Sequence, residues 1–322
     1  MHISNRKTYS IVADVGGTNT RIAMTQGVVL QEFSIQHYAN DQFQTFEQLL
    51  QDYHHSQGLV RCESVCIAIA APVTGQRARL TNRNWIIDQQ SIQQLLGCGS
   101  VKLINDFEAL ALSLNEIGAE HLQPISQSRG KLCGGKKIVL GAGTGFNAAQ
   151  LLDNNLKGVA KVSCAECGHM TLPLESAQEL RLRDYLAASY SRASVERALS
   201  GQGLVNLYQW LGMDKKIATD DLSPAQIAAA ACSGDDPLCV EAGELFSRFF
   251  ARVVGDMALA FLPFGGIYLS GGVSRGLAPL LKQPAFLDTF HAKGRQSELM
   301  KSFNIQLITS DNSALLGCAA AL

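Results

Sequence analysis

Hydrophobic positions near the start of the chain follow a period of two that paired glycines interrupt once. Residues 11–24 read IVADVGGTNTRIAM. The apolar run before the glycines and the alternating run after them predict two strands joined by a tight turn. Gly16 and Gly17 accept positive φ angles and leave backbone N–H groups open. Thr18 and Asn19 add short polar side chains there, so the turn suits a phosphate chain, although an ordinary glycine hairpin has the same pattern.

The pattern that follows alternates between the strand period and the helix period. The order of these elements predicts an α/β layer built on a mixed sheet. Strands are predicted at residues 28–38, 64–70 and 101–104. Helices are predicted at residues 44–53 and 106–114 and within residues 84–96, where the helix is expected to end at Gly97.

A polar, glycine-bearing stretch at residues 123–137 indicates a link to a second unit. That unit opens with a strand at 137–140, the glycine turn Gly141–Gly145 and another apolar run to residue 152. Strand, glycine turn with threonine, and strand therefore occur twice. We infer two copies of one αβ module, with a phosphate turn contributed by each. The expected small domain comprises 1–117 plus 308–322, and the larger one 118–307.

Capping signals mark the helices of the second half. Ser176 with Glu179, and Ser223 with Gln226, each have the spacing of a capping box. A short helix at 194–199 is expected to stop at Gly201. The remaining elements are helices at 236–262 and 313–320, the latter packing on the N-terminal domain, and strands at 266–270 and 306–309.

Composition narrows the class of protein. The chain has 322 residues, of which 47% are hydrophobic and 17% charged, with a formal net charge of −1. The length suffices for two domains, and the near-zero net charge gives no basic face for binding nucleic acid. The nine cysteines follow no secretory signal in residues 1–10, so reduced thiols and a cytoplasmic location are expected. Arg252 and Asp256 interrupt the most apolar helix, which argues against a membrane span.

Two carboxylates stand where apolar runs end. Asp14, just before the first glycine turn, is suited to hold a hydrated Mg²⁺, which prefers one or two carboxylates plus waters. Asn105 and Asp106 end a buried strand, the place where ligands bind in open α/β sheets. Either residue also suits a helix cap, and both roles are compatible. A carboxylate here is able to take a proton from an attacking hydroxyl group and orient it for phosphoryl transfer.

The segment CAECGH at 164–169 has three interpretations. Cys164, Cys167 and His169 are potential zinc ligands, but a fourth ligand at suitable spacing is missing. Glu166 and His169 would alternatively hydrogen-bond a polyhydroxyl ligand. The third interpretation is a loop with buried thiols.

Nucleotide-binding fingerprints of other classes fit less well. The second glycine turn reads G-x-G-x-G rather than the G-x-G-x-x-G of dinucleotide sites, and the first turn does not match either. Dinucleotide binding is therefore the second choice, and the sequence contains no P-loop motif.

Six motifs carry a family resemblance and cover nearly the whole chain: DVGGTNTR, INDF, GAGTG, ECGH, SVERALSGQGLVNLY and LSGGV. In these motifs and in their order, the chain resembles bacterial ATP-dependent glucokinase, a member of the sugar-kinase, actin and chaperone-ATPase superfamily. The resemblance implies an α/β fold with two ribonuclease-H-like (actin-like ATPase) domains around a central cleft. It implies transfer of the γ-phosphoryl group of ATP, with Mg²⁺, to the 6-hydroxyl group of glucose. It also implies a homodimer that binds glucose and ATP.

The resemblance also implies residue roles. Asp106 matches the catalytic base and Asn105 its sugar-binding neighbour, and the other sugar ligands match Glu166, His169 and Glu196. The nucleotide-binding positions match Gly16, Gly17, Thr18 and Asn19 in the first phosphate turn, Gly143 and Thr144 in the second, and Gly271 and Gly272 beside the adenosine. From the residues alone, Glu196 lies at the start of a predicted helix, where a carboxylate favours the helix dipole.

Two departures from the family pattern bear on the sugar site. Ala165 and Cys167 flank Glu166 where glycines are usual, and Phe146-Asn147 follows the second glycine turn where a small residue is common. Cys167 is expected to narrow the sugar pocket or to make it thiol-sensitive, so that glucose slows its alkylation. The alternatives are a kinase for a related hexose and a sugar-sensing regulator of the same fold. A regulator adds a helix-turn-helix before the first phosphate turn, and ten residues before Ile11 are too few for one.

Overall fold

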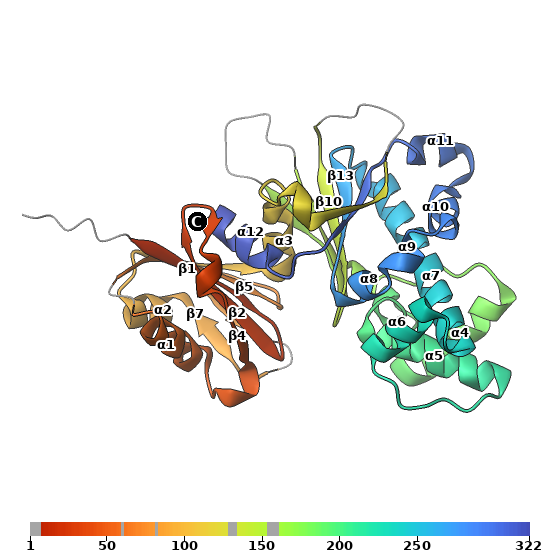
Figure 1. The fold of residues 1–322 in the computed structure, drawn as a ribbon, viewed down its shortest axis with the longest axis horizontal. Coiled ribbons are helices and arrows are strands. Elements are labelled where there is room, and N and C mark those ends of the chain that lie inside the picture. The colour runs from red at the N-terminus through yellow and green to blue at the C-terminus, as the bar shows by residue number, and fades with distance from the viewer. Residues whose placement is uncertain (1–7, 59–60, 81–82, 128–133, 153–160) are drawn as a thin grey trace, which may run out of the picture. The chain divides into compact units, whose positions relative to one another are not determined.

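The computed structural model describes residues 8–58, 61–80, 83–127, 134–152 and 161–322 (Figure 1). Its contacts divide the chain into two compact units, which we describe separately. Unit 1 comprises Met1–Gly118 and Ser310–Leu322, and unit 2 comprises Ala119–Thr309.

Unit 1 is built on a mixed sheet with the strand order β3-β2-β1-β5-β8, in which β4 also pairs with β2. Strand β1 runs antiparallel to β2 and parallel to β5, and β5 runs parallel to β8. The strands are β1 (Tyr9–Val15), β2 (Asn19–Gln26), β3 (Val29–Leu30), β4 (Gln36–Ala39), β5 (Cys62–Ile69) and β8 (Ser100–Asn105).

Helices of unit 1 pack their apolar faces against this sheet. The helices are α1 (Phe46–Ser56), α2 (Gln89–Leu96), α3 (Asp106–Ser113) and α12 (Ser313–Ala321). The strands β6 (Arg77–Arg79) and β7 (Ile86–Asp88) form a separate two-stranded sheet. The four apolar positions that predicted the first helix, Phe46, Leu49, Leu50 and Tyr53, are all fully buried. Helix α12 packs on α3 in unit 1, which confirms that the last helix returns to the N-terminal part of the chain.

Unit 2 repeats the strand pattern of unit 1. Strand β10 runs antiparallel to β11 and parallel to β13, and β13 runs parallel to β14. This is the relation of β1 to β2, β5 and β8, so the predicted repeat of one module is confirmed. The sheet has the order β12-β11-β10-β13-β14-β9, with β12 (Val162–Cys164), β11 (Phe146–Leu151), β10 (Lys137–Ala142), β13 (Gly266–Ser270), β14 (Ile305–Ile308) and β9 (Leu122–Ser126).

The core of unit 2 surrounds the long helix α7, on which Phe246, Phe249 and Phe250 are fully buried. Both predicted capping boxes are present, at Ser176 and at Ser223. The helices are α4 (Ala177–Tyr190), α5 (Gly201–Lys215), α6 (Pro224–Ser233), α7 (Pro237–Phe261), α8 (Gly272–Gly276), α9 (Ala278–Leu281), α10 (Pro284–His291) and α11 (Ser297–Met300).

One strand prediction in unit 1 was wrong in detail. Residues 28–38 form the two short strands β3 and β4 with a 3-10 turn, Glu32–Ser34, between them. The buried Ser34 hydroxyl accepts a hydrogen bond from Met24 N (2.9 Å), and this contact with β2 holds the turn. The helix predicted within residues 84–96 is present as α2, which Asp88 caps and Gly97 ends.

Two predictions in unit 2 also need correction. The expected link at 123–137 begins inside β9, which pairs with β14 at the edge of the sheet, and its residues 128–133 lie outside the described part. The expected helix at 194–199 is a 3-10 turn, Val195–Arg197. Gly201 begins α5 instead of ending a helix, because the preceding Ser200 caps α5 with its side chain.

Among the described residues, no helix combines the length and the apolar character that a bilayer crossing requires.

Candidate functional site

The first glycine turn connects β1 to β2 at the carboxyl end of β1. Gly16 N donates to Asn19 O (3.0 Å) across the turn, and a Cβ on Gly16 would lie 3.2 Å from that oxygen. The side chains of Thr18 and Asn19 are exposed. The predicted hairpin is therefore present, with small or polar groups at its tip.

A buried amide that the sequence analysis missed supports this turn. Asn40 Nδ2 donates to Gly16 O (2.8 Å), and Asn40 N donates to Thr18 O (2.8 Å). Thr20 Oγ1 in turn donates to Asn40 Oδ1 (2.7 Å), and the Asn40 side chain is fully buried. Asn40 follows β4 and is 24 positions away from Gly16, so no local pattern points to it.

Asp14 lies at the end of β1 with 18% of its side chain exposed, and Arg21 Nη1 contacts its Oδ2 at 3.2 Å. Burial raises the pKa of Asp14 above its usual value, and Arg21 opposes that shift. A nearby cation would therefore favour the charged carboxylate. No group of several potential metal ligands occurs in the described residues. The single carboxylate of Asp14 fits an ion that takes most of its ligands from water and phosphate, as Mg²⁺ does.

Asn105 and Asp106 lie at the same edge of the unit 1 sheet as the first glycine turn. The register pairs Val15 with Ile69 and Ile69 with Asn105, so β1, β5 and β8 end together. Asn105 caps α3, because its Oδ1 accepts from Phe107 N (3.0 Å) while its Nδ2 donates to Ala71 O (3.2 Å). Asp106 begins α3, and its Oδ1 also accepts from Phe107 N (3.0 Å). The cap is thus formed by Asn105, at the strand end where open α/β sheets bind ligands.

The second glycine turn connects β10 to β11 and is bonded to two other segments of unit 2. Gly143 N donates to Gly145 O (2.9 Å), and Gly201 N at the start of α5 donates to Gly143 O (2.7 Å). Glu196 Oε2 accepts from Phe146 N (2.9 Å). A Cβ on Gly145 would lie 2.7 Å from that carboxylate oxygen, so this position requires glycine unless Glu196 shifts.

The third pair of glycines lies beside the second turn. Gly271 has φ 98°, and a Cβ there would lie 2.2 Å from Ala142 O. A Cβ on Gly143 would lie 3.8 Å from Gly271 Cα and from Gly272 N. The structure therefore brings together Gly143, Gly271 and Gly272. The dinucleotide alternative does not fit, because the second turn joins two antiparallel strands and not a strand and a helix.

The three predicted sugar ligands of unit 2 lie on neighbouring segments. Val195 N donates to Met170 O (2.9 Å), which joins the segment after His169 to the one that carries Glu196. His169 N donates to Glu166 O (3.1 Å), and a Cβ on Gly168 would lie 3.4 Å from Glu196 Cβ. The side chains of Glu166 and His169 are exposed, and Glu196 is half-buried.

The two residues after the second turn have defined contacts. The Phe146 ring packs edge-on against Phe250, with 5.9 Å between centroids. Asn147 Nδ2 donates to Glu166 Oε2 (3.3 Å), and Asn147 Oδ1 accepts from Cys167 N (3.1 Å). Asn147 therefore binds both the carboxylate of Glu166 and the backbone that follows it, a role that the sequence analysis missed.

The expectation that Cys167 is a thiol-sensitive wall of the sugar pocket is wrong. Its side chain is 3% exposed and belongs to the core of unit 2, and burial raises the pKa of its thiol to about 12. Zinc ligation by Cys164, Cys167 and His169 is not supported either, since the described residues contain no cluster of three such ligands. The third interpretation, a loop with buried thiols, is correct for Cys167 and wrong for Cys164, which is exposed.

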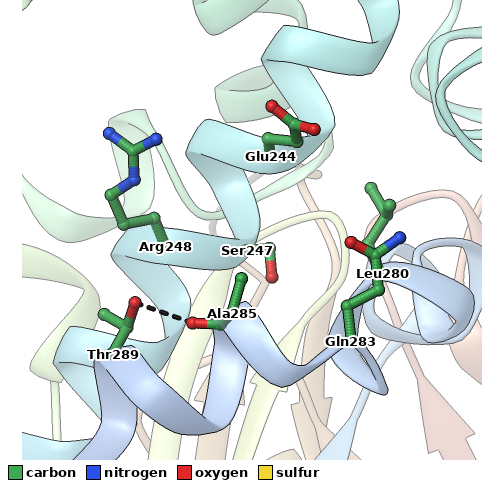
Figure 2. A pocket seen from close by; sticks show the side chains of 7 residues that line it. All are labelled: Glu244, Ser247, Arg248, Leu280, Gln283, Ala285 and Thr289. Carbon is green, nitrogen blue, oxygen red and sulfur yellow. Dashed lines mark hydrogen bonds between the residues drawn. The ribbon is translucent and has the colours of Figure 1, made fainter.

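A pocket elsewhere in unit 2 contains none of these residues. It lies between α7 and the α9–α10 region, with Glu244 and Arg248 on one side and Gln283 and Thr289 on the other (Figure 2). The predicted glycine positions of unit 2 instead follow β10 and β13. Glu166 and His169 follow β12, and Glu196 lies in the 3-10 turn Val195–Arg197.

Comparison with known proteins gives consistent matches over nearly the whole chain. A family model described as Glucokinase matches residues 11–322. A glucokinase of Marinobacter nauticus is 32% identical over 314 residues, which are 98% of this chain and 97% of that protein. The crystal structure of a glucokinase from an Antarctic psychrotroph has a TM-score of 0.83 at 27% identity, covering 98% of both chains. A ROK family glucokinase from Streptomyces griseus in complex with glucose and AMPPNP has a TM-score of 0.68 at 20% identity, covering 97% of this chain and 98% of that one.

Proposed function

Because this chain belongs to the glucokinase family, we propose that it transfers the γ-phosphoryl group of ATP to the 6-hydroxyl group of glucose. The observation that carries the proposal is the placement of Asn105 and Asp106 at the same strand edge as the first glycine turn. A hydroxyl-binding carboxylate and a phosphate-binding turn at one edge are the parts that phosphoryl transfer to a sugar needs. The complex of the Streptomyces griseus relative with glucose and AMPPNP supports the same pair of ligands.

Asp106 acts as the base in this proposal. Its position at the start of α3 fixes the carboxylate, since Oδ1 accepts from Phe107 N. The transition state of phosphoryl transfer is loose, so the base mainly orients the 6-hydroxyl group and takes its proton as the new O–P bond forms. Asn105 would bind a neighbouring sugar hydroxyl group while its cap keeps α3 in place.

The glycine turns bind the nucleotide in this proposal. Gly16, Gly17, Thr18 and Asn19 of unit 1 and Gly143 and Thr144 of unit 2 would contact phosphate oxygens, with Gly271 and Gly272 beside the adenosine. Asp14 would hold Mg²⁺ through water, and the ion would neutralise phosphate charge. The closeness of Gly143 to Gly271 supports binding of one nucleotide by both glycine pairs of unit 2.

Glu166, His169 and Glu196 bind the sugar hydroxyl groups. Carboxylates and imidazole that pair with several hydroxyl groups reject analogues strongly, because a missing hydroxyl group leaves a polar group unpaired. Asn147 contributes indirectly, since it binds Glu166.

A coupled assay with ATP and a panel of hexoses tests the activity, and Asp106→Asn tests the base. The amide keeps an oxygen for the bond from Phe107 N but does not accept a proton, so kcat should fall by about 10²–10⁴-fold. Asp88→Asn is the matched control, because Asp88 is also a carboxylate at the N-terminus of a unit 1 helix: it caps α2 by accepting from Ser91 N (2.9 Å). It should keep kcat within about twofold.

The two parts of the proposal fail in different ways. Wild-type protein that phosphorylates no glucose, or another hexose much faster, refutes the substrate. Asp106→Asn protein that is folded and retains wild-type kcat refutes the role of Asp106 while leaving the substrate intact.

A further inference from the structure

We propose that Asn40 is a positioning residue for ATP: it fixes the backbone of the first glycine turn so that its N–H groups face the nucleotide phosphates. The inference rests on the proposed binding of phosphate by that turn. Asn40 itself touches no substrate, because its side chain is fully buried.

The hydrogen bonds of Asn40 reach both sides of the turn. Its Nδ2 donates to Gly16 O and its backbone N to Thr18 O, both at 2.8 Å. In a trans peptide the N–H group points away from the C=O group of the preceding residue. The bond to Gly16 O therefore directs the Gly17 N–H group away from Asn40. A turn of two glycines is otherwise free to rotate its peptide planes.

The amide of Asn40 is itself held in one orientation. Thr20 Oγ1 donates to its Oδ1 (2.7 Å), so the donor Nδ2 is the atom that faces Gly16. Of the side chains of this size, only an amide both accepts from Thr20 and donates to Gly16. The bond from Thr20 is buried and the bond to Gly16 is partly buried, and an unpaired polar group in such an environment is costly.

Arg83 connects Asn40 to the core of unit 1. Arg83 Nη2 donates to Asn40 O, and its guanidinium lies 4.7 Å from the centroid of the Trp85 ring. Trp85 is 3% exposed and packs near Phe46, with 6.3 Å between ring centroids. The turn is thus anchored through Asn40 and Arg83 to buried aromatic side chains.

Steady-state kinetics of Asn40→Ala and Asn40→Asp, with ATP and glucose varied separately, test the inference. Each variant loses the donor to Gly16. If the free energy of ATP binding weakens by about the value of one buried hydrogen bond, the KM for ATP should rise about fivefold or more. The KM for glucose should stay within about twofold. Calorimetric binding of AMPPNP should weaken by the same factor, which gives a readout that does not depend on turnover.

Ser34→Ala is the matched control. Ser34 is also a fully buried polar residue of unit 1 and binds β2, but it does so at Met24, away from the turn. It should lower the melting temperature without changing the KM for ATP. Thr20→Val, which frees the amide to rotate, should raise the KM for ATP in the same direction, and it serves as the test if the Asn40 variants do not fold.

The result that overturns the inference is a folded Asn40 variant, or Thr20→Val protein, that binds AMPPNP with wild-type affinity. Equal increases of both KM values would also overturn it, because they indicate a general structural effect. Failure of the wild-type protein to use ATP would instead refute the proposed function.

Discussion

Gly317 of α12 lies directly against Ala109 of α3: a Cβ built on Gly317 would be 1.7 Å from Ala109 O. Real atoms do not approach so closely, so the crossing of the two helices requires glycine. Helix α3 carries Asp106 at its first position, and α12 is formed by the last residues of the chain. The C-terminal helix therefore supports the helix on which the proposed base stands.

The change Gly317→Ala should displace α12 or α3. Overpacking of a tight contact costs about 1–3 kcal/mol, and backbone atoms on the far side leave little room for relaxation. We expect a lower free energy of unfolding together with a fall in kcat, because a shift of α3 moves Asp106. Denaturant titration and steady-state kinetics measure the two effects. Ala320→Ser, which adds one atom at a partly exposed position of α12, should change neither.

The contact of Asn147 with Glu166 leads to a prediction about the sugar. Asn147→Gly removes both the donor to Glu166 Oε2 and the acceptor for Cys167 N. Glu166 is exposed, so the freed carboxylate gains rotational freedom and binds a sugar less well. The KM for glucose should rise by about three- to tenfold, with the KM for ATP unchanged.

The matched control for Asn147 lies on the same strand. Gln150 Nε2 donates to Phe261 O (3.2 Å), a contact with the end of α7 that involves no predicted site residue. Gln150→Ala should lower stability and leave the KM for glucose unchanged. A similar rise in KM for both variants would show that Asn147 acts through general stability.

Local patterns predicted the elements and the glycine turns because their causes are local. The helical spacing of Phe46, Leu49, Leu50 and Tyr53 reports one buried face, and the capping box at Ser176 involves residues three apart. The repeated strand–turn–strand module is local in the same sense.

Contacts between distant residues left no such pattern. Asn40 binds a turn 24 positions before it, and Asn147 binds Cys167 20 positions after it, so neither role is visible in a window of sequence. The prediction of one continuous strand at 28–38 was wrong because of another contact between distant residues: the Ser34 hydroxyl group binds Met24 of a neighbouring strand. Cys167 was placed at the pocket from its position beside Glu166, whereas its side chain points into the core.

A buried ion pair supports the segment that leads from His169 to α4. Glu179 is 1% exposed, and its Oε2 accepts from Arg252 Nη1 of α7 (2.9 Å) and from Ser176 N (3.1 Å). Arg252 Nη1 also donates to Pro173 O (3.3 Å). The pair therefore joins α4, α7 and the chain just before α4.

The change Glu179→Gln should destabilise the protein in a pH-dependent way. Burial raises the pKa of Glu179, but the bonds from Arg252 and from the backbone N–H groups of Glu175 and Ser176 outweigh it, and the pKa lies below its usual 4.5. A lowered pKa in the folded state contributes stability above the pKa of the unfolded chain, and this stability is lost as the pH falls through the folded value.

At pH 7 the Glu179→Gln variant should lose about 3 kcal/mol of unfolding free energy, the usual cost of breaking a buried pair. The difference from wild type should shrink as the pH falls below about 4.5, because the unfolded chain then takes up a proton at Glu179, and it should be smallest at the lower pH where the folded carboxylate is protonated as well. Asp214→Asn, which breaks the more exposed pair with Arg181, should cost under about 1 kcal/mol. Urea titrations of the three proteins at pH 7 and pH 4 measure this, and a pH-independent difference for Glu179→Gln would show that its charge does not contribute.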